Sequence, residues 1–313
     1  MNNSQINEAL FRHAFIVAMI IGTLCRFFVL RVKDSQYPTT PQDYIEQIIV
    51  ASLAASLGAV AFPALIDKEF SALTFLAVGI QQFQGLAQQE KITLENTDAD
   101  ELVGKGESYI DAIATTYEVR SYISLFSALT ASLMYIFISR KYNATSLVCT
   151  LFAIAGGVIV ALIFRKILKR SSIKDVADVY PAKISFDGPI LKVNDIVMTN
   201  IGLKDTRNKY LEKGIAIEIV PKDMSAFGII NDIGQGRVIM HNIYLHMGID
   251  KDVDEPDIQS IVKTNLKKKT VLIITIPLLK DEVTLMQVAE SAPILDTAKG
   301  KQSAYKKKTL LFK

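Results

Sequence analysis

Cysteine is scarce in this chain, and its scarcity excludes a disulfide-stabilised fold. Only Cys25 and Cys149 occur among the 313 residues, each within an apolar run. Two isolated thiols provide neither a disulfide framework nor a zinc-ligand spacing, so we expect both to be buried structural thiols. The net charge of only +3 is too small to indicate nucleic-acid binding. The sequence therefore predicts no nucleic-acid partner.

Charged side chains are also absent from three long stretches, Gln47–Ile66, Ser121–Ser139 and Tyr142–Phe164. Each has about the length at which a helix crosses the hydrocarbon core of a bilayer. A fourth apolar run, Ala14–Leu30, lacks a small-residue cleavage site behind it, so we interpret it as a retained first span and not as a signal peptide. The pattern predicts about four spans, all within residues 1–170.

Arg26 is the one charged residue inside the first span. Arginines near the end of a membrane helix commonly extend to the interface, and we expect Arg26 and Arg31 to anchor the helix in this way. A paired, functional charge inside the bundle is the alternative. Small residues recur at every fourth position of the other spans, which predicts close helix packing. They are Ala51, Ala55, Ala59, Ser124, Ala128, Ser132, Ala153, Gly157 and Ala161.

The segment Phe70–Gln89 is uncharged but less apolar than the spans. Its apolar residues keep helical spacing beside a polar stripe that includes Thr74, Gln81 and Gln88. This pattern predicts an amphipathic helix that lies at the interface or covers the bundle. The alternative is a pore lining, which is the basis of a second hypothesis, a channel or transporter. The strongly acidic stretch that follows, Glu90–Glu107, is interpreted as a solvated loop.

Two helix starts carry a similar pattern of tyrosine, isoleucine and an acid, each before a span. Such internal likeness occurs in transporters built from repeats. The residues that we single out as candidates for interaction are Tyr44, Glu46, Tyr109, Ile110, Asp111, Glu118 and Arg120.

From about Ser171 onward, short β-branched runs alternate with charged helical ones, which predicts a soluble α/β or α+β domain. We expect an extended pair near Ala182–Phe186 and Leu191–Thr199, one helix from Asp223 towards Gly248, and an edge strand at Pro293–Thr297. The expected organisation is a membrane domain over residues 1–170 with the amphipathic helix and acidic loop, a soluble domain over 171–298, and a basic tail over 299–313.

No catalytic, cofactor or metal site is expected in this half. The stretch Asp250–Glu255 begins like a calcium loop, but Glu255 occupies the position that requires glycine. His241 and His246 are five residues apart, which is a poor spacing for a metal site on one helix face. The sequence therefore favours a protein that is not an enzyme.

One hexapeptide carries a specific resemblance. Tyr109-Ile-Asp-Ala-Ile-Ala114 resembles the signature of the YIEGIA family of bacterial membrane proteins. Leu57–Ala61, Gln81–Phe83, Asn200–Leu203 and Pro221–Asp223 are similar to that family as well, so the resemblance spans nearly the whole chain. Within the hexapeptide, aspartate stands where the family name has glutamate, and alanine where it has glycine.

The resemblance implies a functionally uncharacterised component of a membrane assembly in endospore-forming Gram-positive bacteria. The family is associated with a small protein described as a capping complex subunit, and no catalytic residue is assigned. We therefore expect a non-enzymatic scaffold or subunit of a membrane complex, used during sporulation. Its expected partners are the lipid bilayer and either a capping-type protein or a second copy.

Positive charges predict the orientation. Arg165, Lys166, Lys169 and Arg170 directly follow the last span, so the soluble domain is expected to be cytoplasmic. We favour four crossings, with the amino terminus on the same side. A fifth crossing at Phe70–Gln89 remains the alternative.

Overall fold

The computed structural model describes residues 8–30, 41–168, 171–252 and 255–300. The chain divides into two compact units. The helical unit comprises residues up to Ile92 together with Ile113–Lys169. The C-terminal unit comprises Thr93–Ala112, which we call the connecting segment, together with the residues from Arg170 onward. The sequence-based boundary at residue 170 assigned the connecting segment to the membrane half, whereas its contacts group it with the C-terminal unit.

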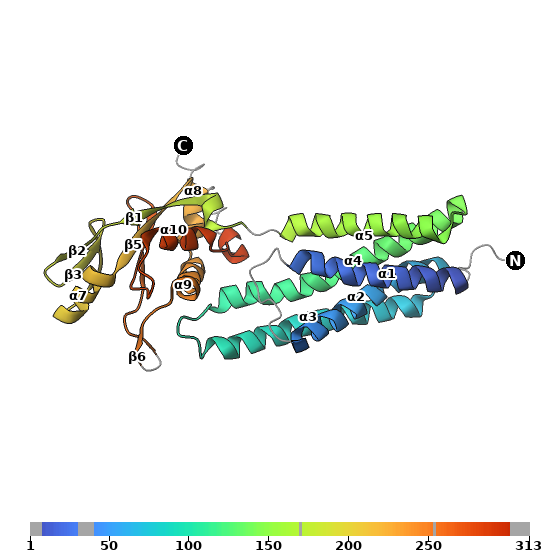
Figure 1. Ribbon diagram of the computed structural model, residues 1–313, viewed down its shortest axis with the longest axis horizontal. Helices are drawn as coiled ribbons and strands as arrows, with labels where there is room; N and C mark the ends of the chain where they lie inside the picture. The colour runs from blue at the N-terminus through green and yellow to red at the C-terminus, as the bar shows by residue number, and fades with distance from the viewer. Residues whose placement is uncertain (1–7, 31–40, 169–170, 253–254, 301–313) are drawn as a thin grey trace. The chain divides into compact units, whose positions relative to one another are not determined.

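Five long helices supply the helical unit within the described ranges (Figure 1). They are α1 (Glu8–Leu30), α2 (Pro41–Asp67), α3 (Phe70–Asp98), α4 (Glu107–Tyr142) and α5 (Ser146–Leu168). Four of them, α1, α2, α4 and α5, are long and apolar enough to cross a membrane. The predicted helical bundle is confirmed.

Small side chains let these helices approach closely, as the small residues at every fourth position predicted. Ala55, Ala59 and Ala128 are fully buried in one apolar cluster. The Ser132 hydroxyl donates to the Ala59 carbonyl oxygen over 3.0 Å. At Gly58, an added Cβ would lie 2.0 Å from the Leu125 carbonyl oxygen. Backbone contact of this kind replaces the hydrophobic driving force that is missing inside lipid.

Helix α3 covers the bundle through its apolar side. Phe83 packs with Ala54 of α2 and Leu125 of α4, while Thr74 and Gln81 are exposed. The interpretation of Glu90–Glu107 as a loop is wrong in its first half, because α3 continues to Asp98. No glycine or proline interrupts Glu90–Asp98, so charge alone does not end the helix.

The C-terminal unit is built on a four-stranded antiparallel sheet with the order β1-β5-β9-β8. Its strands are β1 (Ala177–Ala182), β5 (Ile215–Pro221), β8 (Ile261–Asn265) and β9 (Thr270–Thr275). Every residue of β9 is buried. The helices that contact β1 or β5 include α6 (Ile173–Val176), α8 (Met224–Ile230) and α10 (Glu282–Ser291), and α9 (Ile233–Met247) packs against α8 and α10.

A smaller antiparallel sheet with the order β2-β3-β4 shares a core with the first. Leu191 and Val193 of the smaller sheet pack with Leu272 and Ile274 of β9 and with Tyr210. The predicted mixed α/β region is confirmed. The remaining elements are β2 (Ile184–Asp187), β3 (Ile190–Val193), β4 (Ile196–Asn200), α7 (Lys204–Lys213) and the short ribbon β6–β7 (Lys251–Asp252, Glu255–Pro256).

Two expected elements differ in the structure. The helix expected from Asp223 to Gly248 is two helices, because Asp232 caps α9 by accepting a hydrogen bond from the Gln235 amide. The strand expected at Pro293–Thr297 is wrong: Pro293 forms a single bridge with Ser172, and residues 296–300 are helical. Most of the predicted basic tail, residues 301–313, lies outside the described residues.

Candidate protein-interaction site

The connecting segment contains the loop between α3 and α4, which is closed by Asp98, the last residue of α3. The Asp98 carboxylate accepts hydrogen bonds from the backbone amides of Lys105, at 2.5 Å, and Gly106, at 3.1 Å. The Lys105 ammonium lies 2.9 Å from a carboxylate oxygen of Glu101. Gly106 has φ +81°, in the region that glycine adopts without strain. The two amides at the start of α4 are thereby satisfied by a charged acceptor.

His241 of α9 fixes the middle of this loop. Its side chain is 2% exposed, and Nδ1 lies 2.7 Å from the Val103 carbonyl oxygen. Because a carbonyl only accepts, Nδ1 carries the proton and donates. Burial is the main cause that lowers the pKa of His241 below its ordinary value of 6.5. The ring of Tyr109 meets the His241 ring edge-on, with the centroids 6.3 Å apart.

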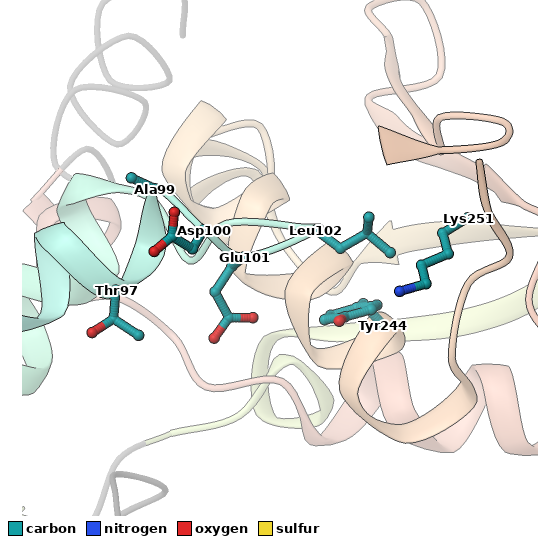
Figure 2. A pocket seen from close by; sticks show the side chains of 7 residues that line it. All are labelled: Thr97, Ala99, Asp100, Glu101, Leu102, Tyr244 and Lys251. Atoms are coloured by element: carbon teal, nitrogen blue, oxygen red, sulfur yellow. The ribbon is translucent and has the colours of Figure 1, made fainter. Parts of the chain in front are cut away.

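Three hollows border the connecting segment in the C-terminal unit. The first, of about 650 Å³, is lined by Thr97, Ala99, Asp100, Glu101, Leu102, Tyr244 and Lys251. Figure 2 shows Lys251 reaching towards the Tyr244 ring beside Leu102, with both acidic side chains on the connecting segment. The second and third hollows, of about 300 and 400 Å³, both include Gly106 and Arg237. The three hollows together form what we call the segment surface.

The chemistry of this surface suits a protein partner. Asp100 and Lys251 are exposed, and Tyr244 is half-buried, so charges of both signs lie around an aromatic ring. Such a mixture is typical of the rim and anchors of a protein interface. Among the described residues, no group of three or more histidine, cysteine, aspartate or glutamate side chains is placed to hold a metal ion.

The structure distributes the singled-out residues over both units. In the C-terminal unit, Tyr109 and Ile110 are buried and Asp111 is exposed. In the helical unit, Tyr44 and Glu46 are exposed on the first turns of α2, and Arg120 is buried. Glu118 accepts a hydrogen bond from the Tyr122 hydroxyl. Thr74, Gln81 and Gln88 all lie exposed on α3.

Arg26 does not behave as an interfacial anchor. Its side chain is 1% exposed inside the helical unit. Nη2 donates to the Gln47 side-chain oxygen at 2.6 Å, and Nη1 to the Ser121 hydroxyl at 3.3 Å. The expectation that Arg26 extends to the interface is wrong, and the alternative of a partnered charge inside the bundle is the one observed. A glutamine in the second turn of α2 is the sequence signal that could have indicated this partner.

A bundle of apolar helices that can cross a bilayer, followed by a mixed α/β region, defines a multi-pass membrane protein. The chain belongs to the YIEGIA family, since the model described as "YIEGIA protein" matches residues 14–305. It is similar to the "Uncharacterized protein YphB" of Bacillus subtilis (strain 168), with 32% identity over 286 residues that cover 91% of this chain and 93% of the relative. No solved structure matches the chain significantly.

Proposed function

We propose that this protein is a non-enzymatic scaffold subunit of a membrane complex, and that the segment surface recruits a small protein partner. The observation that carries the proposal is the contact of the acidic connecting segment with α9. The Val103 carbonyl accepts a hydrogen bond from His241, and the Asp98 carboxylate accepts one from the Lys105 amide. These bonds hold the connecting segment in one conformation, in which Asp100 is exposed at the border of the first hollow. A segment held in one conformation binds at a lower entropic cost.

The charge of the connecting segment selects the chemistry of the partner. Six acidic residues occur between Thr93 and Ala112, against Lys105 as the only basic one. A basic face on a small protein complements this surface and accelerates association. The family resemblance supports a capping-type subunit as this partner and sporulation as its setting. The basic residues after the last span, Arg165 and Lys166, support a cytoplasmic position for the C-terminal unit.

A crosslinking pull-down of the full-length protein from native membranes tests this proposal. Asp100 is exposed at the border of the first hollow, so Asp100→Ala is expected to lose a defined small partner that the native protein retains. Asp205→Ala is the matched control, because Asp205 is another exposed acid of the C-terminal unit and lines none of the three hollows. Recovery of no partner by the native protein would remove the main support for a scaffold.

A channel or transporter is the second candidate, and the polar face of α3 favours it. Thr74, Gln81 and Gln88 are exposed in the single chain, so a pore lined by them requires several copies. Flux measurements in reconstituted liposomes address this role. Flux that is reduced by Gln81→Leu supports it, and flux that is unaffected by this change counts against it.

A further inference from the structure

Contacts within the helical unit establish that α2 and α4 run parallel. The Arg26 guanidinium binds Gln47 near the start of α2 and Ser121 of α4. Farther along both helices, Ser132 of α4 donates to the Ala59 carbonyl of α2. Moving from residue 47 to 59 along α2 therefore corresponds to moving from 121 to 132 along α4.

Two successive spans that run in the same direction require a return crossing between them. Helix α3 is the helix that joins α2 to the connecting segment, and it runs antiparallel to α2. An added Cβ on Gly79 would meet Leu57, and Phe83, one turn later, packs with Ala54, one turn earlier. The 20 residues Phe70–Gln89 carry no charge, and a helix of that length spans about 30 Å, the thickness of the hydrocarbon core.

We propose that α3 is a fifth crossing and that its outward polar face binds the same face of α3 in a second copy of this chain. The glutamines explain why α3 does not have the hydropathy of a span. Phe83 and Ala87 face inward and are buried, whereas Thr74, Gln81 and Gln88 face outward and are exposed. Amide groups that face hydrocarbon without a hydrogen-bond partner are strongly unfavourable.

The chemistry of this face selects a second copy as the occupant. A side-chain amide both donates and accepts hydrogen bonds, so a row of uncharged amides complements itself. A two-fold axis along the membrane normal brings the same residues of two copies together. Interhelical bonds between glutamines are a known means of association in lipid.

Gly85 supplies an independent observation on the same face. It lies one turn after Gln81 in the middle of α3, where glycine weakens a helix relative to alanine. At other glycines of the bundle, such as Gly22 and Gly58, an added Cβ would collide with a neighbouring helix, but at Gly85 it would meet nothing within 4 Å. The close approach that this glycine permits is therefore to a helix outside the single chain.

Side-specific labelling of single cysteines tests the crossing. Glu69→Cys and Asp100→Cys are placed at opposite ends of α3, in a background with Cys25→Ala and Cys149→Ala, and exposed to a membrane-impermeant maleimide before and after permeabilisation. A fifth crossing predicts that the two positions label from opposite sides. Labelling of both from the same side overturns it. If the background does not fold, the native background serves, because both native thiols are buried.

Disulfide trapping in native membranes tests the pairing. Gly85→Cys is expected to form a covalent dimer under mild oxidation, whereas Leu162→Cys, an exposed position of α5, is expected to stay monomeric. Gly85→Leu is expected to reduce chemical crosslinking between copies by at least threefold. Absence of a Gly85→Cys dimer, or equal trapping at both positions, overturns the pairing. Neither result depends on the segment surface, so this proposal and the scaffold proposal fail separately.

Discussion

The Arg26–Gln47 pair shows how a single polar residue can organise apolar helices. A buried guanidinium is costly unless acceptors surround it, and Gln47 supplies one at 2.6 Å. The pair therefore fixes the positions of α1 and α2 along each other. Helices in lipid have little hydrophobic reason to prefer one such position, because apolar side chains are equally well solvated by lipid.

Gln47→Leu is expected to destabilise the helical unit by about 1.5–3 kcal/mol, the usual worth of a hydrogen bond to a charged group. Thermal unfolding in detergent measures the change. Gln42→Leu is the matched control, since Gln42 is exposed on the same helix. Adding Arg26→Met to Gln47→Leu is expected to recover part of the loss, because both partners are then apolar. Equal stability of the Gln42 and Gln47 variants would contradict this role.

His241 couples the connecting segment to pH. Burial favours the neutral ring and keeps the pKa of His241 in the folded state below its ordinary value of 6.5. The unfolded chain therefore takes up a proton at a higher pH than the folded one does. Folding stability is fully present above about pH 6.5 and decreases as the pH falls towards the folded-state pKa.

Thermal unfolding between pH 7.5 and pH 5.5 tests this dependence. We expect the native protein to lose stability at the acidic end, and His241→Asn to show a weaker dependence over the same window. An asparagine amide still donates to the Val103 carbonyl but does not titrate. His246→Asn is the control, because His246 is exposed. An unchanged pH profile in His241→Asn would show that another group is responsible.

At the scale of elements, the loop between α3 and α4 is held in place by the carboxylate of Asp98. Asp98 ends α3 and accepts both amides that precede α4. Asp98→Ala removes these acceptors, so hydrogen exchange at Lys105 and Gly106 is expected to accelerate by about tenfold or more, which corresponds to about 1.5 kcal/mol. Asp100→Ala should leave both rates unchanged, since Asp100 is exposed. Equal acceleration in the two variants would contradict the specific role of Asp98.

The elements also show what the sequence could predict. The spans were predictable because uncharged runs have one stable conformation in lipid, a helix. The end of α3 was not predictable in this way, because the charges of Glu90 and Glu95 suggested a loop, although both residues have a high helix propensity. Strand β1 was missed because it contains Pro181, and proline argues against a strand inside a sheet. However, β1 lies at the sheet edge, where proline is tolerated. The break before α9 depends on the Asp232 cap, which an apolar pattern does not show.

The candidate site was harder to predict than the fold. The hexapeptide at Tyr109 drew attention to the start of α4, but the His241 ring that contacts Tyr109 lies more than 130 residues away in the sequence. Periodicity describes one element at a time and contains no information about such pairs. Likewise, only the tertiary structure brings Lys251 and Tyr244 together with Asp100 in the first hollow, so the sequence could not predict this group.

At the scale of the whole molecule, the chain combines a bundle that anchors it in a membrane with a C-terminal unit that presents the segment surface. In the sequence, the connecting segment lies between two parts of the helical unit, but its contacts group it with the C-terminal unit. The proposed scaffold thus has two separate contacts, the segment surface for a small basic partner and the α3 face for a second copy. Each contact has its own variants, so the two roles can be measured independently.

The measurement that tests the scaffold role most directly is site-specific photo-crosslinking in native membranes of sporulating cells. A photoreactive residue at position 100 samples the largest hollow, and one at position 187, in the β2–β3 hairpin, is a control on another exposed acidic site of the same unit. We predict a defined adduct with a small protein from position 100 and none from position 187. No adduct from position 100, or the same adducts from both positions, would contradict the recruitment of a partner by this surface.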